Sequence, residues 1–111
     1  MMALHHARSG EVINLISYSE LPEVQSQAIV STPDLEVMRL CMPAGKQLPP
    51  HAVAGPITLM CLKGHIDVHA HGAWHPMHVN DHLFLDGGVE HALKANSEAV
   101  VLVNIQRRPE R

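Results

Sequence analysis

The sequences PAGKQLPPHAVAGPITLMCLKG, residues 43–64, and NDHLFLDGGVEH, residues 80–91, decide the fold of this 111-residue chain. Each combines turn residues, a short apolar run and a histidine. In the first stretch, His51 follows two prolines, which lack a backbone N–H and favour an extended path. In the second stretch, His91 follows a turn signal that contains two glycines. We therefore expect a stiff, extended segment to deliver His51, and a strand that follows the turn to carry His91.

Short β-compatible segments continue on both sides of these stretches, separated by Gly, Pro and polar turns. None shows the period of a helix, and the run at 57–62 is apolar enough for a strand that is covered on both faces. This pattern predicts an antiparallel all-β sandwich or barrel. The segments that we interpret as strands are 11–17, 25–31 (an edge strand), 35–42, 57–62, 65–71, 74–79, 83–85, 89–94 and 99–105.

The alternating segment 65–71 and the returning segment 74–79 predict a β-hairpin with Gly72-Ala73 as its two-residue turn. In that register Asp67 lies opposite His78. The hairpin then separates into two faces. The apolar face gathers Ile66, Val68, Ala70, Met77 and Val79 with His75, and the polar face gathers His65, His69, His71 and Trp74 with the Asp67–His78 pair. We interpret the histidines of the polar face as a solvated surface, on which nickel or zinc binds adventitiously during purification.

The two stretches resemble the two motifs of the cupin superfamily, in particular those of small single-domain RmlC-like cupins. In the first stretch, His51 follows Gly45 after five residues, and the motif ends at Gly64. The cupin pattern has a second His at the place of Val53 and a Glu at that of Ile57. The first motif is therefore degenerate.

In the second stretch, Asn80-Asp81 stands where the cupin pattern has Gly-Asp, and Asp86-Gly87-Gly88 stands where it has Pro-x-Gly. His91 occupies the place of the motif histidine. The resemblance covers about 55 residues from Met38 onward. It implies an all-β fold, a single cupin double-stranded β-helix or jelly-roll barrel, and cupins of this length pair as homodimers.

Along the chain, we expect a flexible N-terminus at residues 1–10, the cupin domain at 11–106 and a frayed C-terminal tail at 107–111. The length fits one domain with a core of its own. Because only three residues are aromatic while 46% are apolar, that core is expected to be aliphatic and rich in methionine. Cys41 and Cys61 lie in apolar segments, where reduced, buried thiols are expected.

In metal-binding cupins, the two His and the Glu of the first motif and the His of the second hold one divalent metal. Here the resemblance leaves His51 and His91 as metal ligands, for Fe, Mn, Ni or Zn. Two ligands hold a metal poorly unless a third donor completes the set. Gln47 and His75 are the candidates for that third donor.

Replacing polar ligands by Val53 and Ile57 makes one wall of the pocket apolar. A small-molecule ligand is then expected in a pocket lined by His51, Val53, Ile57 and His91. Three functions stay open: a binder of a small molecule, a metal-dependent enzyme of the oxygenase, isomerase or decarboxylase type, and a structural or interaction module without a ligand. In the enzyme, a pocket histidine would act as general base, but no acid partner is identified.

Charge and composition exclude other functions. The net charge is −3 with eight Lys and Arg, which gives neither the basic surface nor the aromatic stacking that nucleic acids require. No apolar run reaches the length of a signal peptide or a membrane span. We expect a cytoplasmic protein without nucleic-acid or membrane partners.

Overall fold

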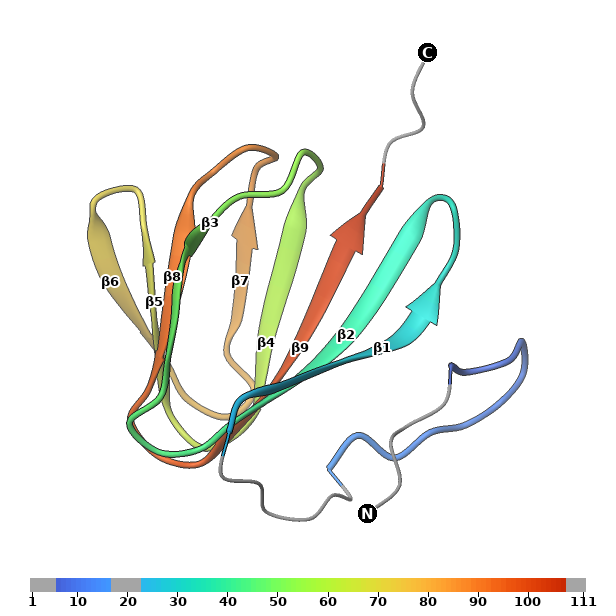
Figure 1. Cartoon of the computed structure of the whole chain (residues 1–111), viewed down its shortest axis with the longest axis horizontal. Helices are drawn as coiled ribbons and strands as arrows, with labels where there is room; N and C mark the ends of the chain where they lie inside the picture. Colours follow the sequence, from blue (N-terminus) through green and yellow to red (C-terminus); the bar gives the residue numbers. More distant parts are fainter. Residues whose placement is uncertain (1–5, 17–22, 108–111) are drawn as a thin grey trace.

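The computed structural model describes residues 6–16 and 23–107. Within them, nine strands form two antiparallel sheets, and there is no helix (Figure 1). No helix in that part of the chain meets the length and apolarity needed to cross a membrane. The five-stranded sheet has the order β1 (Gln25–Ser31), β2 (Leu35–Met42), β9 (Ala99–Gln106), β4 (Ile57–Lys63) and β7 (His82–Leu85). The four-stranded sheet has the order β3 (Gln47–His51), β8 (His91–Ala95), β5 (Ile66–Ala70) and β6 (Ala73–Met77).

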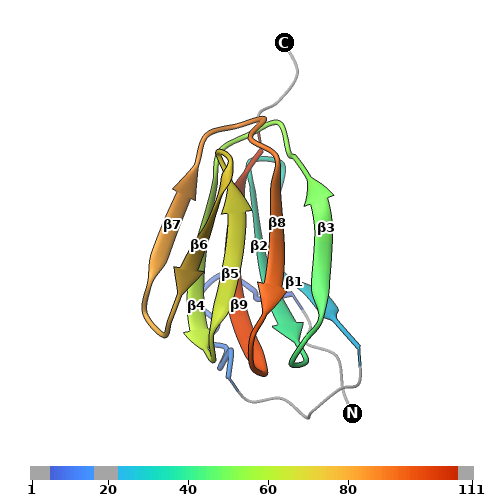
Figure 2. The same cartoon turned by 90° about the vertical axis from the view of Figure 1, so that its left-hand side faces the viewer.

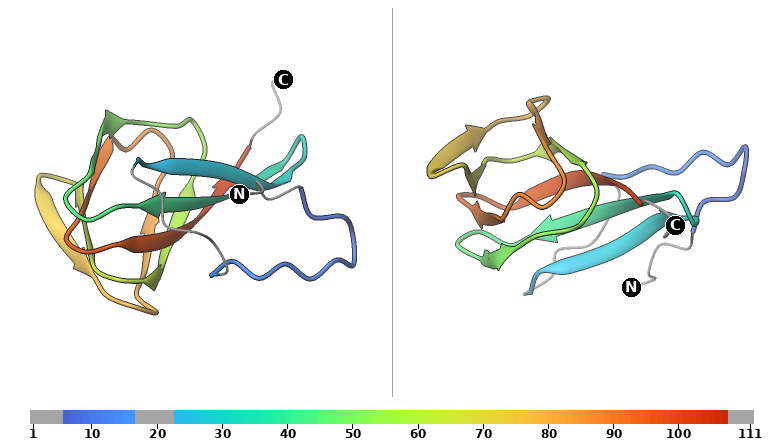
Figure 3. Two further views of the ribbon diagram at one scale, coloured as in Figure 1. Left: turned by 60° about the horizontal axis from the view of Figure 1, so that its bottom comes forward. Right: turned by 90° about the horizontal axis from the view of Figure 1, so that it is seen from above.

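The two sheets pack face to face and enclose the core (Figures 2 and 3). Alternate residues of each strand point inwards, as the pleat of a strand requires. The core is aliphatic, as expected, whereas Trp74 and Phe84 are 51% and 55% exposed. Its largest fully buried side chains are Met42, Leu59, Ile66, Val68, Val100, Val101 and Cys61.

Pairing between distant segments closes the jelly roll. Strand β2 pairs with β9 over its whole length, from Leu35 opposite Gln106 to Met42 opposite Ala99. On its other side β9 pairs with β4, so the last strand of the chain lies at the centre of the larger sheet. This topology is the all-β jelly-roll barrel that was predicted.

Most predicted strands lie where the sequence placed them. The bounds of β2 agree with the prediction, and β1 is an edge strand as expected. Residues 57–62 form most of β4, although its outward side chains are only half-buried. The strand predicted at 11–17 is wrong for the described part, because residues 11–16 join no sheet. β-compatible residues do not suffice where no strand edge is there to receive their hydrogen bonds.

The predicted hairpin exists, but its register is shifted by two residues. Strands β5 and β6 place His69 opposite Trp74 and Asp67 opposite Pro76, so the predicted pairing of Asp67 with His78 is wrong. The turn consists of His71 and Gly72, with φ angles of 52° and 76°. Positive φ at both central residues defines a type I′ turn, whose twist matches that of the strands. A shift of two residues preserves the faces, and Ile66, Val68 and Ala70 are buried as predicted.

Parts of both predicted terminal segments are bonded to the barrel. The Ala7 amide donates to the Ile29 carbonyl at 2.6 Å, and the Arg107 amide donates to the Asp34 carbonyl at 2.8 Å. The Arg39 guanidinium, on the outer face of the larger sheet, donates to the Leu15 carbonyl at 3.2 Å. The segment around residues 6–16 is thereby attached to β1 and β2.

Candidate ligand-binding pocket

A pocket of about 290 Å³ lies between the two sheets, at the end of the barrel where the β3–β4 and β7–β8 connections meet. The two connections are joined there by a hydrogen bond of 2.8 Å from the Gly88 amide to the Val53 carbonyl. Both sheets contribute side chains, and ten of the thirteen lining residues are apolar. The lining consists of Val24, Ser26, Met38, Leu40, Leu48, His51, Val53, Ile57, Leu59, His91, Leu93, Val103 and Ile105.

His51 and His91 meet at one wall of this pocket. They are directly opposite one another across β3 and β8, and their ring centroids are 4.4 Å apart at an angle of 55°. His91 is only 4% exposed, whereas His51 lies at an exposed position at the end of β3. The pairing of the two strands thus brings together two histidines that are forty residues apart in the sequence.

Both rings are oriented by their own backbone. The Nδ1 atom of His91 lies 3.0 Å from the Val89 carbonyl oxygen, and that of His51 lies 3.4 Å from the Pro49 carbonyl oxygen. A carbonyl only accepts hydrogen bonds, so the 3.0 Å contact favours the tautomer of His91 that carries its proton on Nδ1. The contact of His51 is longer than an ordinary N–H···O hydrogen bond and assigns no tautomer.

Val53 and Ile57 line the same pocket and make it apolar where metal-binding cupins carry a His and a Glu. Gln47 and His75 are not among the residues that line it. Gln47 pairs with Lys94 in the sheet, and the Nε2 atom of His75 lies 3.1 Å from the Ala70 carbonyl oxygen.

Within residues 6–16 and 23–107, no three His, Cys, Asp or Glu side chains are grouped to hold a metal. Among the described residues, the pocket offers two imidazoles and the Ser26 hydroxyl, but no Cys, Asp or Glu side chain. These residues do not fit a resident metal held by protein ligands alone.

No charged side chain of the described residues lines the pocket. A neighbouring depression of about 450 Å³ shares Val53 and Ile105 with it and contains Glu36 and Arg107. These two side chains form an ion pair, and the Arg107 guanidinium also donates to the Thr32 carbonyl at 3.0 Å. The Arg107 guanidinium is therefore engaged outside the pocket.

The two thiols lie apart from the pocket. Both are buried and reduced, as expected. Burial raises the pKa of Cys41, although the charge of Arg39 partly opposes the shift. Burial also raises the pKa of Cys61, whose thiol donates to the Gly64 carbonyl at 3.4 Å. Protonated, enclosed thiols of this kind are poor nucleophiles.

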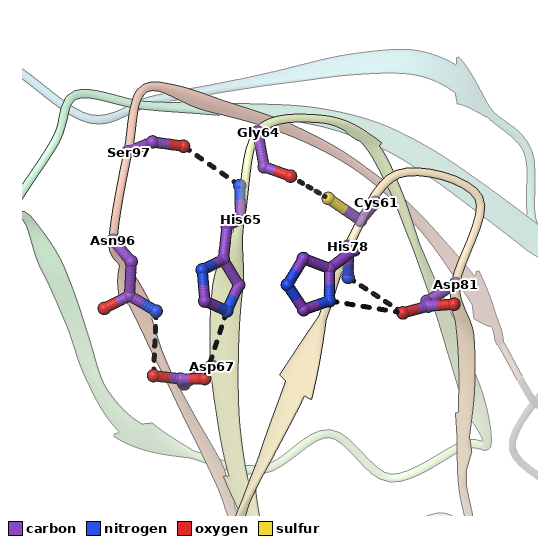
Figure 4. A network of polar contacts seen from close by, with 8 residues as sticks. All are labelled: Cys61, Gly64, His65, Asp67, His78, Asp81, Asn96 and Ser97. Atoms are coloured by element: carbon purple, nitrogen blue, oxygen red, sulfur yellow. Dashed lines mark hydrogen bonds and ion pairs between the residues drawn. The ribbon is translucent and has the colours of Figure 1, made fainter.

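Two histidines of the predicted polar face, His65 and His78, contact each other and nearby carboxylates (Figure 4). The His65 and His78 rings stack with centroids 4.2 Å apart. His65 Nε2 lies 3.8 Å from Asp67, and His78 Nδ1 lies 3.9 Å from Asp81. Asp67, predicted to face His78, instead accepts a hydrogen bond of 2.8 Å from Asn96.

Sequence reasoning missed the far wall of the pocket. Ser26, Met38 and Leu40 come from β1 and β2, and Val103 comes from β9. The alternation of apolar residues in these segments indicates which side chains face inwards, but it does not tell which strands lie across from the histidines.

Comparison with known proteins identifies the class of fold. No protein-family model matches the sequence, and no curated protein matches it. The structure, in contrast, is similar to many solved ones. A conserved protein of unknown function from Streptococcus pyogenes superposes with a TM-score of 0.83 at 17% identity, over 99% of this chain and 98% of that one.

Two further similar structures are of proteins described as cupins. A cupin superfamily protein from Desulfitobacterium hafniense has a TM-score of 0.82 at 11% identity, over 97% of this chain and 100% of that chain. An RmlC-like cupin from Shewanella frigidimarina has a TM-score of 0.71 at 16% identity, over 85% of this chain and 91% of that chain. The protein has the cupin fold, built as one double-stranded β-helix.

Proposed function

We propose that this protein binds a small, largely apolar molecule in the pocket around His51 and His91. The observation that supports this function is the composition of the pocket: ten apolar side chains enclose about 290 Å³ beside two imidazoles. Binding sites for small molecules are typically concave, mostly apolar and equipped with a few polar groups that orient the ligand.

The other two functions have weaker support. A metal-dependent enzyme needs a third donor, and the lining contains no Cys, Asp or Glu beside the two histidines. A structural module would have no need of an apolar pocket with two imidazoles at one wall. Cupin-fold proteins serve many functions, so the proposal depends on this pocket and not on the fold.

The experiment is a ligand screen that compares the wild type with a variant whose pocket is filled. Val53→Phe places a larger side chain at the pocket, from the loop between β3 and β4. Val79→Phe is the matched control, because Val79 is exposed and does not line the pocket. Small molecules detected by ligand-observed NMR should bind the wild type and Val79→Phe, and should be lost in Val53→Phe. Equal binding by all three proteins would contradict the proposal.

Elemental analysis of untagged protein, purified without a nickel column, tests the metal-dependent alternative. Near-stoichiometric metal that disappears in both His51→Ala and His91→Ala would favour that alternative, with a donor supplied by the bound molecule. His82→Ala is the control, because His82 is exposed on β7 outside the pocket. Metal that survives in both pocket variants and falls in His82→Ala would be adventitious surface metal.

A further inference from the structure

The geometry points to a ligand class for this pocket: a small apolar molecule that carries a hydroxyl or another hydrogen-bond donor and presents it to His91 and His51. This inference rests on the proposed function, since it names the chemistry of the molecule that the pocket takes. It follows from the few polar groups of the pocket, the two imidazoles and the Ser26 hydroxyl, each of which can accept a hydrogen bond.

His91 is the centre of this acceptor character. Its Nδ1 atom lies 3.0 Å from the Val89 carbonyl oxygen, a good hydrogen-bond distance, so Nδ1 carries the proton. In neutral imidazole the other nitrogen is then an unprotonated acceptor. His91 as a whole is only 4% exposed, and its side chain lines the pocket. A ligand that covers the Nε2 atom without donating a hydrogen bond leaves an unpaired buried acceptor, which costs binding free energy.

His51 adds a second imidazole, whose contact with its own backbone is longer, at 3.4 Å. Its Nδ1 atom is directed at the Pro49 carbonyl oxygen, two residues earlier in the chain, as in His91. Pro49 belongs to the stiff double-proline segment, so the carbonyl is well positioned to orient the ring. The ring centroids are 4.4 Å apart, which places the second imidazole next to any group bound at the first.

The rest of the lining offers little to an anion. Ser26 provides a hydroxyl, which both donates and accepts, and the other ten residues are apolar. Among residues 6–16 and 23–107, no Lys or Arg lines the pocket, and the Arg107 guanidinium of the neighbouring depression is paired with Glu36 and bonded to Thr32. A carboxylate would lose its water without gaining a cation, which is unfavourable. The ligand is therefore a neutral donor and not an acid anion.

The size of the pocket limits the apolar part of the ligand. About 290 Å³ is at the lower end of the range of roughly 300–1,000 Å³ that is usual for small-molecule sites. A single ring or a short branched chain with one hydroxyl, such as a phenol or a cyclic alcohol, has the required dimensions and chemistry.

The first test is the tautomer of His91, which needs no ligand. A two-bond ¹H–¹⁵N correlation spectrum of ¹⁵N-labelled protein distinguishes a protonated from an unprotonated ring nitrogen. The spectrum is recorded at about pH 7.5, above the ordinary imidazole pKa of about 6.5, and the His91 signals are assigned by their loss in His91→Phe. We expect a protonated Nδ1 and an unprotonated Nε2. A protonated Nε2 would overturn the inference.

The second test uses three probes of one shape: cyclohexanol, which donates, cyclohexanone, which only accepts, and cyclohexanecarboxylate, which is an anion. From chemical-shift titrations, we expect cyclohexanol to bind about two- to tenfold more tightly than cyclohexanone, the range that one net hydrogen bond provides. The carboxylate should bind most weakly. Equal binding of alcohol and ketone, or tightest binding of the carboxylate, would overturn the inference while leaving the pocket as a binding site. If none of the three binds, the proposed function fails as well.

Variants link the preference to the histidines. His91→Phe and His51→Phe keep a ring of similar shape and remove the acceptor, so each should reduce the ratio of alcohol to ketone affinity. His82→Phe, outside the pocket, should leave the ratio unchanged. Since His51 lies at an exposed position, its variant is available if the buried substitution prevents folding. An unchanged ratio in the folded histidine variants would contradict the assigned role.

Discussion

Gly64, between β4 and β5, combines two demands that only glycine meets. Its φ is +81°, and an added Cβ would lie 2.1 Å from the Glu98 carbonyl oxygen. Gly45 has a similar φ of +83° but open space where a Cβ would lie. Comparing alanine substitutions at Gly45 and Gly64 therefore distinguishes the cost of a left-handed backbone conformation from the cost of a steric clash.

We predict that Gly45→Ala lowers the free energy of unfolding by about 1–2 kcal/mol, the cost of the left-handed conformation. Gly64→Ala should lower it by about 2–4 kcal/mol, because overpacking is added. Urea unfolding of both variants and the wild type measures the difference. Equal losses would mean that the contact with Glu98 relaxes freely.

The thiols give a prediction of pH dependence. Burial raises the folded-state pKa of Cys41 and Cys61, so the unfolded chain releases these protons first. The free energy of unfolding should therefore be insensitive to the thiols well below pH 9.0, the ordinary thiol pKa, and fall as the pH rises through that value. Urea unfolding between neutral and alkaline pH measures this slope.

The Cys41→Ala/Cys61→Ala variant is the control for other groups that titrate at alkaline pH. Its stability should decline less steeply than that of the wild type, although its starting stability is lower. Parallel declines in the two proteins would show that the thiols titrate alike in the folded and unfolded states.

At the scale of the element, the β5–β6 hairpin carries a conformational cost at His71. A type I′ turn favours Asn-Gly, because Asn tolerates positive φ better than His. We predict that His71→Asn raises the free energy of unfolding by about 0.5–1 kcal/mol, within the range of turn effects. The measurement is urea unfolding.

His69→Asn serves as the comparison within the same hairpin. His69 lies in the regular part of β5 and contacts Trp74 edge-on, with centroids 5.0 Å apart. The change should lower stability there, because Asn is disfavoured in strands and loses the cross-strand contact. If both His71→Asn and His69→Asn raised the free energy of unfolding, the turn conformation would not explain the effect at His71.

Strand β3 shows why prolines occur beside a pocket histidine. It is an edge strand, paired only with β8, so the missing N–H groups of Pro49 and Pro50 are tolerated there. The register is irregular between Leu48 and His51. The edge position lets a stiff, poorly pairing segment present His51 to the pocket while β8 anchors it.

For the whole molecule, the topology predicts slow folding. The first and last long strands, β2 and β9, pair across some sixty residues of chain. Closing such loops costs entropy before the contacts are made, and all-β domains dominated by distant pairings fold in milliseconds to seconds. Stopped-flow refolding from urea should give rates in that range. Submillisecond folding would contradict the view that β2–β9 pairing limits the rate.

The homodimer expected from the resemblance stays a prediction. Light scattering coupled to size-exclusion chromatography should give a mass near twice the 12.2 kDa of the chain. Among the described residues, the exposed aromatic side chains Trp74 and Phe84 are available to an interface, which tends to be enriched in such residues. A mass of a single chain across the accessible concentration range would contradict the prediction.

Local patterns in the sequence determined most of the strands and the two motif histidines. Strand β3 was expected only as an extended segment. The bounds of β2 follow from a β-compatible run between turn residues, and the faces of the hairpin follow from the alternation in residues 65–71. Such features are local, because the period of a strand and the conformations of Gly and Pro are set by neighbouring residues. The resemblance of two short motifs added the jelly roll.

Tertiary structure alone decided the register of the hairpin, the partners of each strand and the orientation of the imidazoles. Residues 11–16 have β-compatible side chains but join no sheet, and the opposite wall of the pocket comes from β2 and β9. Both outcomes depend on which backbone edges meet, and a single strand's sequence does not specify its partner. The acceptor character of the pocket likewise arises only when the Val89 carbonyl lies beside His91, because the position of a ring proton is set by the group that it contacts.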